Sequence, residues 1–102
     1  MKKFDREKYS PPAKKFKALG HPLRLWLVRQ VMDEPHCVQE LVALTDFDFS
    51  TISQHLNALK EADILTGEKR GKQVFYTLKC SCVRTFLTCV EEQRKSGKSR
   101  KD

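Results

Sequence analysis

The spacing of apolar residues changes abruptly near residue 63, and this change limits the folds open to the chain. Before it, Ile52, Leu56 and Leu59 recur at the intervals that place side chains on one face of a helix. After it, residues 64–66 and 73–78 are rich in β-branched and aromatic side chains, which favour strands. The basic segment between these strands contains two glycines, so we expect a helix followed directly by a hairpin with a cationic tip.

A second short helix is predicted just before this pattern. Val38, Leu41 and Val42 repeat at helical spacing, and residues 45–48 are typical of a turn that ends in Asp48, a good N-cap. Two helices joined by a short turn, with a hairpin directly after them, form a winged helix-turn-helix.

The flanking segments predict three more helices. We expect Pro11-Pro12 to block any helix that crosses it, so a first helix begins there, with Phe16 and Leu19 facing inward. Pro22 opens a second helix, and residues 83–90 carry the apolar stripe of a last one. The expected fold is therefore mostly α: a winged helix-turn-helix with five helices and a two-stranded wing.

Length and composition indicate one soluble domain. The chain has 102 residues, of which 39% are hydrophobic and 32% charged. It has no apolar run near the roughly 20 residues of a membrane span and no apolar stretch after its charged start, so we expect a cytoplasmic protein without a membrane partner. Most of the net charge of +7 lies at the two ends. We expect flexible basic segments at 1–10 and 94–102 around a domain at 11–93.

The outer face of the helix after Asp48 is polar but almost uncharged. Solvated helix faces are usually richer in Lys and Glu, whereas Gln and Asn can pair with adenine in the major groove and Ser can contact bases. The basic hairpin tip suits phosphate or minor-groove contacts, although a merely soluble turn has a similar composition. We expect His55 to contact a phosphate or to play a local structural role. The candidate DNA-contacting residues are Ser50, Thr51, Ser53, Gln54, His55, Asn57, Lys60, Lys69, Arg70 and Lys72.

Catalytic signatures are not evident in the sequence. It shows no Ser/His/Asp spacing, no phosphate-binding glycine loop and no paired carboxylates in a defined site. We therefore expect no enzymatic activity and no required cofactor. A winged-helix interaction module that does not bind DNA remains an alternative.

Four segments resemble the ArsR/SmtB repressors. Residues 17–25 look like the opening signature of that family, residues 37–41 are similar to its third helix, residues 50–65 to its recognition helix and residues 71–78 to its second wing strand. The resemblance implies a homodimer built on the first and last helices. It also implies binding to an inverted repeat in double-stranded operator DNA and release when an inducer binds.

The resemblance further implies where an inducer would bind. Family members carry a Cys-Val-Cys metal site on the third helix; Cys37 matches the first cysteine, but Gln39 replaces the second. Zinc sensors use an Asp and a His just after the wing and two later ligands. Cys80-Ser81-Cys82 stands at the first pair, whereas Gln93 and Ser96 stand at the later positions. These departures argue against both usual sites and leave Cys37 as a small buried residue.

Three cysteines remain for a thiol sensor: Cys80, Cys82 and Cys89. Thiolates select soft ions, and the resemblance implies arsenite or antimonite as the inducer, because trivalent arsenic usually takes three thiolates. Cys82 and Cys89 would lie about 10 Å apart along one helix. A single site therefore needs either a helix that starts after Cys82 or a cysteine from the other subunit. Thiol oxidation, or simple packing of Cys89 in a dimer core, are the alternatives.

Overall fold

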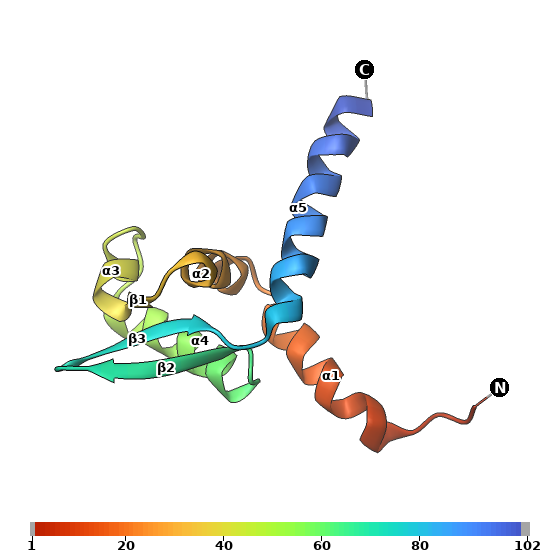
Figure 1. The fold of residues 1–102 in the computed structure, drawn as a ribbon, viewed down its shortest axis with the longest axis horizontal. Helices are drawn as coiled ribbons and strands as arrows, with labels where there is room; N and C mark the ends of the chain where they lie inside the picture. Colours follow the sequence, from red (N-terminus) through yellow and green to blue (C-terminus); the bar gives the residue numbers. More distant parts are fainter. Residues whose placement is uncertain (1, 101–102) are drawn as a thin grey trace.

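The computed structural model describes the backbone of residues 2–100 and the side chains of residues 2–93. Over this part of the chain, five helices and three strands follow one another (Figure 1). They are α1 (Arg6–Leu19), α2 (Pro22–Asp33), β1 (His36–Cys37), α3 (Val38–Val42), α4 (Phe49–Glu61), β2 (Leu65–Arg70), β3 (Gln73–Leu78) and α5 (Ser81–Arg100). The order and type of these elements confirm the predicted mostly α winged helix-turn-helix.

A single hydrophobic core holds the helix-turn-helix against α2 and the wing. Its fully buried side chains are Leu27, Val28, Val31, Leu41, Ile52, Leu56, Leu59, Ile64 and Leu65. Each buried aliphatic side chain of this size stabilises the fold by about 1.5–3 kcal/mol relative to leaving it exposed. Because α4 contacts α2, α3 and β2, its apolar face is fixed in the core and its polar face is left at the surface.

The wing has one strand more than predicted. β1 pairs with β3, with Cys37 opposite Phe75, and completes an antiparallel sheet in the order β1-β3-β2. A two-residue strand has no apolar period, so the sequence gives no signal for it. The predicted turn over 67–72 is also too long: β2 continues to Arg70, and the hairpin turns at the next two residues. Gly71 supplies the positive φ, 64°, that this tight turn needs.

The expectation that Pro11-Pro12 excludes a helix is wrong. α1 begins at Arg6 and passes through both prolines. Asp5 starts the helix, because its Oδ1 accepts a hydrogen bond from the amide of Glu7 at 3.1 Å. The fixed φ of proline is helical, and the hydrogen bonds that the two prolines remove would have been to the first turn of α1, which is exposed to solvent. The predicted segment 1–10 therefore contributes the start of α1.

α1 and α5 leave the body of the molecule in different directions (Figure 1). Leu19 is buried as predicted, but Phe16, also predicted to face inward, is 59% exposed and packs edge-to-face on Phe86. That part of the prediction is wrong for a single chain, because the contact with Phe86 leaves most of the Phe16 side chain exposed. The side chains of the predicted tail, 94–102, lie outside the described residues. Among the helices of the described residues, none combines the length and the apolar composition of a membrane span.

Candidate nucleic-acid interface and thiol cluster

The polar face of α4 lies at the surface as the sequence predicts. Ile52, Leu56 and Leu59 hold the opposite face in the core, with none of their surface exposed. Ser50, Gln54, Asn57 and Lys60 are exposed, and Thr51 and Ser53 are half-buried. We call Ser50, Ser53, Gln54 and Asn57 the reading face. Their short donors and acceptors are held on a rigid helix, which is the arrangement that base recognition requires.

Asp48 fixes the start of this helix. Its Oδ1 accepts a hydrogen bond from the Thr51 amide at 2.8 Å. Hydrogen bonds from Thr51 hold the pKa of the Asp48 carboxyl below its ordinary value, so the carboxylate stays charged. It therefore occupies an amide that would otherwise be open to a phosphate at the helix N-terminus.

His55 faces α2. Arg24 Nε donates to His55 Nδ1 at 3.0 Å, and the rings of His21 and His55 have centroids 4.7 Å apart. Arg24 also donates to the backbone oxygen of Ala18 at 3.4 Å, so it links three helices. These contacts favour the structural role for His55 over the phosphate contact.

We expect His55 to make the fold less stable in mild acid. Burial, followed by the positive charges of Arg24 and His21, holds the pKa of His55 below its ordinary value of 6.5. The unfolded chain thus binds this proton more tightly than the folded chain. The stability that neutral His55 contributes is complete above pH 6.5 and is lost as pH falls through the lowered pKa of the folded state. The urea midpoint should fall between about pH 7.5 and about pH 5.5, and should fall less in His55→Gln. An equal fall in both proteins would rule this out.

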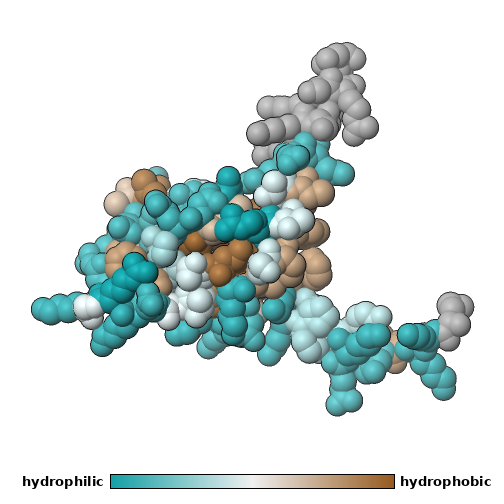
Figure 2. Space-filling model, in the orientation of Figure 1, coloured by the Kyte–Doolittle hydropathy of each residue, from teal (hydrophilic) through white to brown (hydrophobic). Residues whose placement is uncertain are grey.

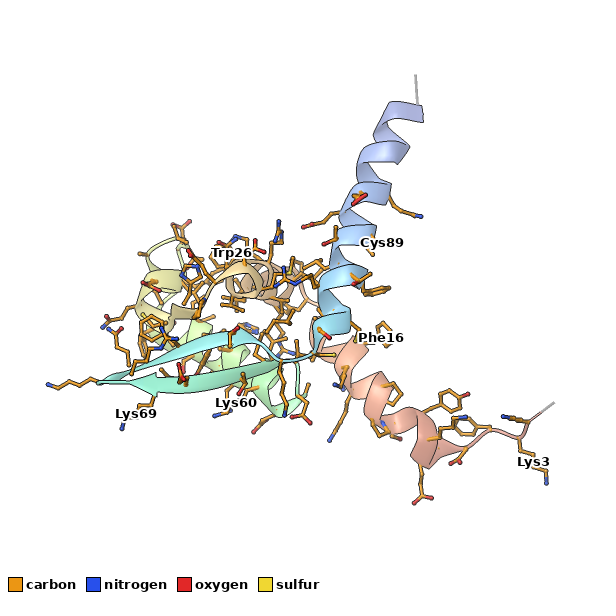
Figure 3. All side chains as sticks on the ribbon, in the orientation of Figure 1. Lys3, Phe16, Trp26, Lys60, Lys69 and Cys89 are labelled. Carbon is orange, nitrogen blue, oxygen red and sulfur yellow. The ribbon has the colours of Figure 1, made fainter. Side chains whose placement is uncertain are left out.

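The wing tip carries cations beside the reading face. Arg70 Nε donates to Glu68 Oε1 at 2.8 Å, and its guanidinium lies over the Phe75 ring at 5.0 Å, so Arg70 is engaged within the wing. Lys69 and Lys72 are exposed; Figure 3 shows Lys69 pointing away from the body. Among the three predicted wing cations, these two are therefore the better placed for phosphate contacts.

Cys80 and Cys82, which we call the thiol pair, lie at the start of α5. Their Sγ atoms are 3.1 Å apart, and Lys15 Nζ of α1 donates to Cys80 Sγ at 3.8 Å. The hydrogen bond from Cys82, helped by the charge of Lys15, lowers the pKa of Cys80. The same hydrogen bond raises the pKa of Cys82. The pair therefore loses its first proton from Cys80.

All three predicted sensor cysteines line one apolar groove of about 650 Å³ between α1 and α5. Cys89 is exposed on α5, on the same side of the molecule as Phe16 (Figure 3).

α5 begins at Ser81, so Cys82 is already helical and the alternative of a helix that starts later is wrong. Within the described residues of one chain, no three His, Cys, Asp or Glu side chains converge on a point that could hold a metal ion. Cys37 is buried, with 3% of its surface exposed, as predicted for a core residue.

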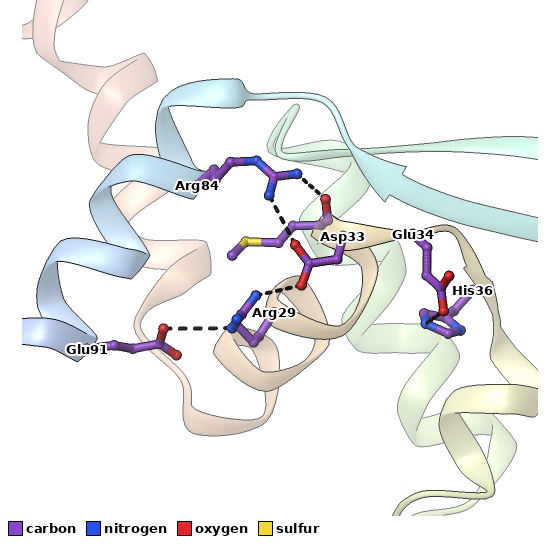
Figure 4. A network of polar contacts seen from close by, with 7 residues as sticks. Arg29, Asp33, Glu34, His36, Arg84 and Glu91 are labelled. Atoms are coloured by element: carbon purple, nitrogen blue, oxygen red, sulfur yellow. Dashed lines mark hydrogen bonds and ion pairs between the residues drawn. The ribbon is translucent and has the colours of Figure 1, made fainter.

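A polar network that the sequence does not reveal ties α5 to the end of α2 (Figure 4). Arg84 donates to Asp33 Oδ1 at 3.1 Å and to the backbone oxygen of Met32. Arg29 pairs with Asp33 at 3.0 Å and approaches Glu91 at 3.7 Å. The Arg84 hydrogen bond is the main cause of the lowered pKa of Asp33. α2 leads directly into β1 and α3, so this network connects the thiol helix with the helix-turn-helix.

Comparison with known proteins agrees with this architecture. Residues 21–66 match the family described as bacterial regulatory protein, arsR family. The HTH-type transcriptional repressor SmtB of Mycobacterium tuberculosis is 40% identical over 62 residues, which are 61% of this chain and 46% of SmtB. The chain thus spans about half the length of that relative.

Two further proteins match over most of the chain. The uncharacterized HTH-type transcriptional regulator MJ1325 of Methanocaldococcus jannaschii is 34% identical over 87 residues, covering 84% of this chain and 98% of MJ1325. The homodimeric winged helix-turn-helix domain of Mb0332 from Mycobacterium bovis superposes with a TM-score of 0.83 at 20% identity, covering 96% of this chain and 93% of that one. The chain belongs to the arsR family of HTH-type transcriptional regulators.

Proposed function

We propose that this chain is a homodimeric repressor that binds double-stranded operator DNA in the cytoplasm and is released by arsenite or antimonite. The observation that carries the DNA-binding part is the exposed reading face of α4 with Lys69 and Lys72 beside it. Short polar side chains on a helix whose opposite face is buried in the core suit contacts to base edges, and the wing lysines suit contacts to the flanking phosphates. We propose a binding protein, not an enzyme, with no cofactor required for DNA binding.

The apolar face shared by α1 and α5 supports the homodimer. Phe16, Phe86 and Val90 are each more than half exposed, and Leu25 beside them is 38% exposed. Figure 2 shows apolar residues gathered where the lower part of α5 meets the body. Contiguous exposed apolar surface of this kind marks an interaction site. A second copy that packs its own α1 and α5 there would bury both faces, because a twofold interface uses the same patch on each subunit.

The thiol pair supports a soft-ion inducer. Two sulfur atoms 3.1 Å apart already converge, and trivalent arsenic or antimony usually takes a third. Cys89 of the same chain stands about 10 Å further along α5, which is too far for one ion. We therefore propose that Cys89 comes from the second copy, which would place the inducer across the dimer interface.

The network around Arg84 is the proposed route from the thiols to the DNA-binding surface. Replacing Arg84 with alanine should leave DNA binding in place and weaken its response to arsenite by about 2- to 30-fold, the range for residues that carry coupling between sites. Lys79→Ala is the matched control, because Lys79 also forms a surface ion pair, with Asp63 at 3.1 Å, but does not join α5 to α2. Equal loss of response in both variants would count against the route.

The test of the proposed function uses the whole reduced chain and a duplex that the chain itself selects from a random-sequence pool. Fluorescence anisotropy should report tight binding to the selected duplex and its loss when arsenite or antimonite is added. If the chain binds the duplex but no thiol-reactive ion or mild oxidant releases it, the proposed inducer is wrong. Failure to select any duplex would exclude the DNA-binding function and favour a winged-helix interaction module.

A further inference from the structure

Phe49 is a large apolar residue at an unusual position. It is the first residue of α4 and is 55% exposed, so most of its ring adds nothing to the core of a single chain. The neighbouring N-cap, Asp48, locks the first turn through its hydrogen bond to Thr51. The start of the helix is therefore rigid, and the Phe49 ring is presented to solvent from a fixed backbone.

The surroundings of Phe49 are partly polar and partly apolar. It borders a shallow groove of about 260 Å³ between α3, α4 and β3. Ser53 of the reading face and Lys72 of the wing line the same groove. Gln73 of β3 donates to Gln39 of α3 at 2.7 Å, which fixes the wing against the helix-turn-helix along this groove. The aromatic ring thus shares one groove with a candidate base-contacting hydroxyl and a candidate phosphate-contacting ammonium group.

We propose that Phe49 determines sequence specificity by packing against the 5-methyl group of a thymine in the major groove. This inference rests on the proposed DNA-binding function. The first residues of a recognition helix lie nearest the base edges, and the thymine methyl is the apolar group that a base pair presents there. Besides Phe49, the groove combines apolar side chains with Ser53, Lys72 and two glutamines, so its occupant must present an apolar group together with polar or anionic groups. DNA meets both requirements, because its phosphates are anionic and its thymines carry an apolar methyl group.

Deoxyuridine tests this contact directly, since it differs from thymidine only by that methyl group. Each thymine of the selected duplex is replaced in turn by deoxyuridine, and binding of the whole chain is measured. Each half-site should contain one thymine that Phe49 contacts. Replacing that thymine in a single half-site should lower the affinity of the wild-type protein by about fourfold, which corresponds to the free energy of burying one methyl-sized group. Replacement in both half-sites should lower it by about 15-fold. Phe49→Ala should bind the thymidine and deoxyuridine duplexes equally.

Phe47→Ala is the matched control. Phe47 is 48% exposed and stands two residues earlier, but it does not line the groove. This variant should keep the preference for thymidine. Phe49→Leu should keep part of it, because leucine retains an apolar contact. Thermal melting followed by circular dichroism checks that the variants are folded, which we expect because both rings are largely exposed.

Three results would overturn the proposal: a wild-type protein indifferent to every thymine methyl, a Phe49→Ala protein that still discriminates, or loss of discrimination in Phe47→Ala instead. If wild type selects a duplex but ignores the methyl groups, only the role of Phe49 fails. If wild type selects no duplex, the proposed function fails and the role of Phe49 fails with it.

Discussion

Gln54→Ala is expected to weaken binding to the selected duplex by about 5- to 150-fold, the loss that follows from removing one bidentate base contact. Gln54 is exposed in the middle of the reading face, one turn of α4 from the helix start, where its amide can donate and accept at one adenine. The affinity for duplexes of unrelated sequence should hardly change, because the protein binds such duplexes through contacts to phosphates and not to bases. Competition between selected and unrelated duplexes measures both quantities.

Two variants make this prediction specific. Gln30→Ala changes a half-buried glutamine of α2 and should leave sequence preference intact. Lys72→Ala should weaken selected and unrelated duplexes alike and should reduce the salt dependence by about one phosphate per protomer. If Gln54→Ala weakens both kinds of duplex equally, the reading face contacts the backbone and its assignment to base recognition is wrong.

Cys82→Ser is expected to abolish release by arsenite while DNA binding in the absence of arsenite stays unchanged. Inducer coupling in regulators of this kind is typically about 5- to 150-fold, and a site that loses one of two converging sulfurs should lose all of it. Cys82 is exposed and its side chain supports no part of the core, so the substitution should not unfold the chain. Cys37→Ala, which removes a buried thiol outside the groove between α1 and α5, should retain the response.

Mixed dimers test whether the site spans two subunits. One protomer carries Cys89→Ser, and the other carries Cys80→Ser together with Cys82→Ser. If the thiol pair works with Cys89 of the second copy, the mixture forms one intact site per dimer and recovers a response that neither variant shows alone. No recovery would contradict the intersubunit site. Release by mild oxidant instead of arsenite, dependent on Cys80 and Cys82 alone, would favour thiol oxidation, which the 3.1 Å separation also permits.

The helix-turn-helix could be predicted because burial imposes a period on the sequence. Ile52, Leu56 and Leu59 must enter the core together, so the opposite face of α4 follows from the same spacing. The hairpin follows from the change of period near residue 63, and its turn contains Gly71, whose positive φ is a local requirement.

Features that depend on tertiary contacts could not be predicted. β1 forms because Cys37 meets Phe75 of a strand far along the chain. Arg84 reaches Asp33 across 51 positions of sequence, and no spacing reveals such a pair. For Phe16, apolar spacing indicates that a side chain will be covered, but it does not distinguish the core of the same chain from a second copy. The prolines of α1 show that a local rule fails where a cap such as Asp5 supports the preceding turn.

The most direct test of the central claim is the salt dependence of duplex binding by the whole chain. Lys60, Lys69 and Lys72 of two protomers would neutralise about six phosphates, so the logarithm of the association constant should fall linearly with the logarithm of salt concentration, with a slope of roughly −5. A steep slope together with preference for the selected duplex is the predicted result. A slope near zero, or no measurable duplex binding at low salt, would contradict the assignment of this chain as a DNA-binding repressor.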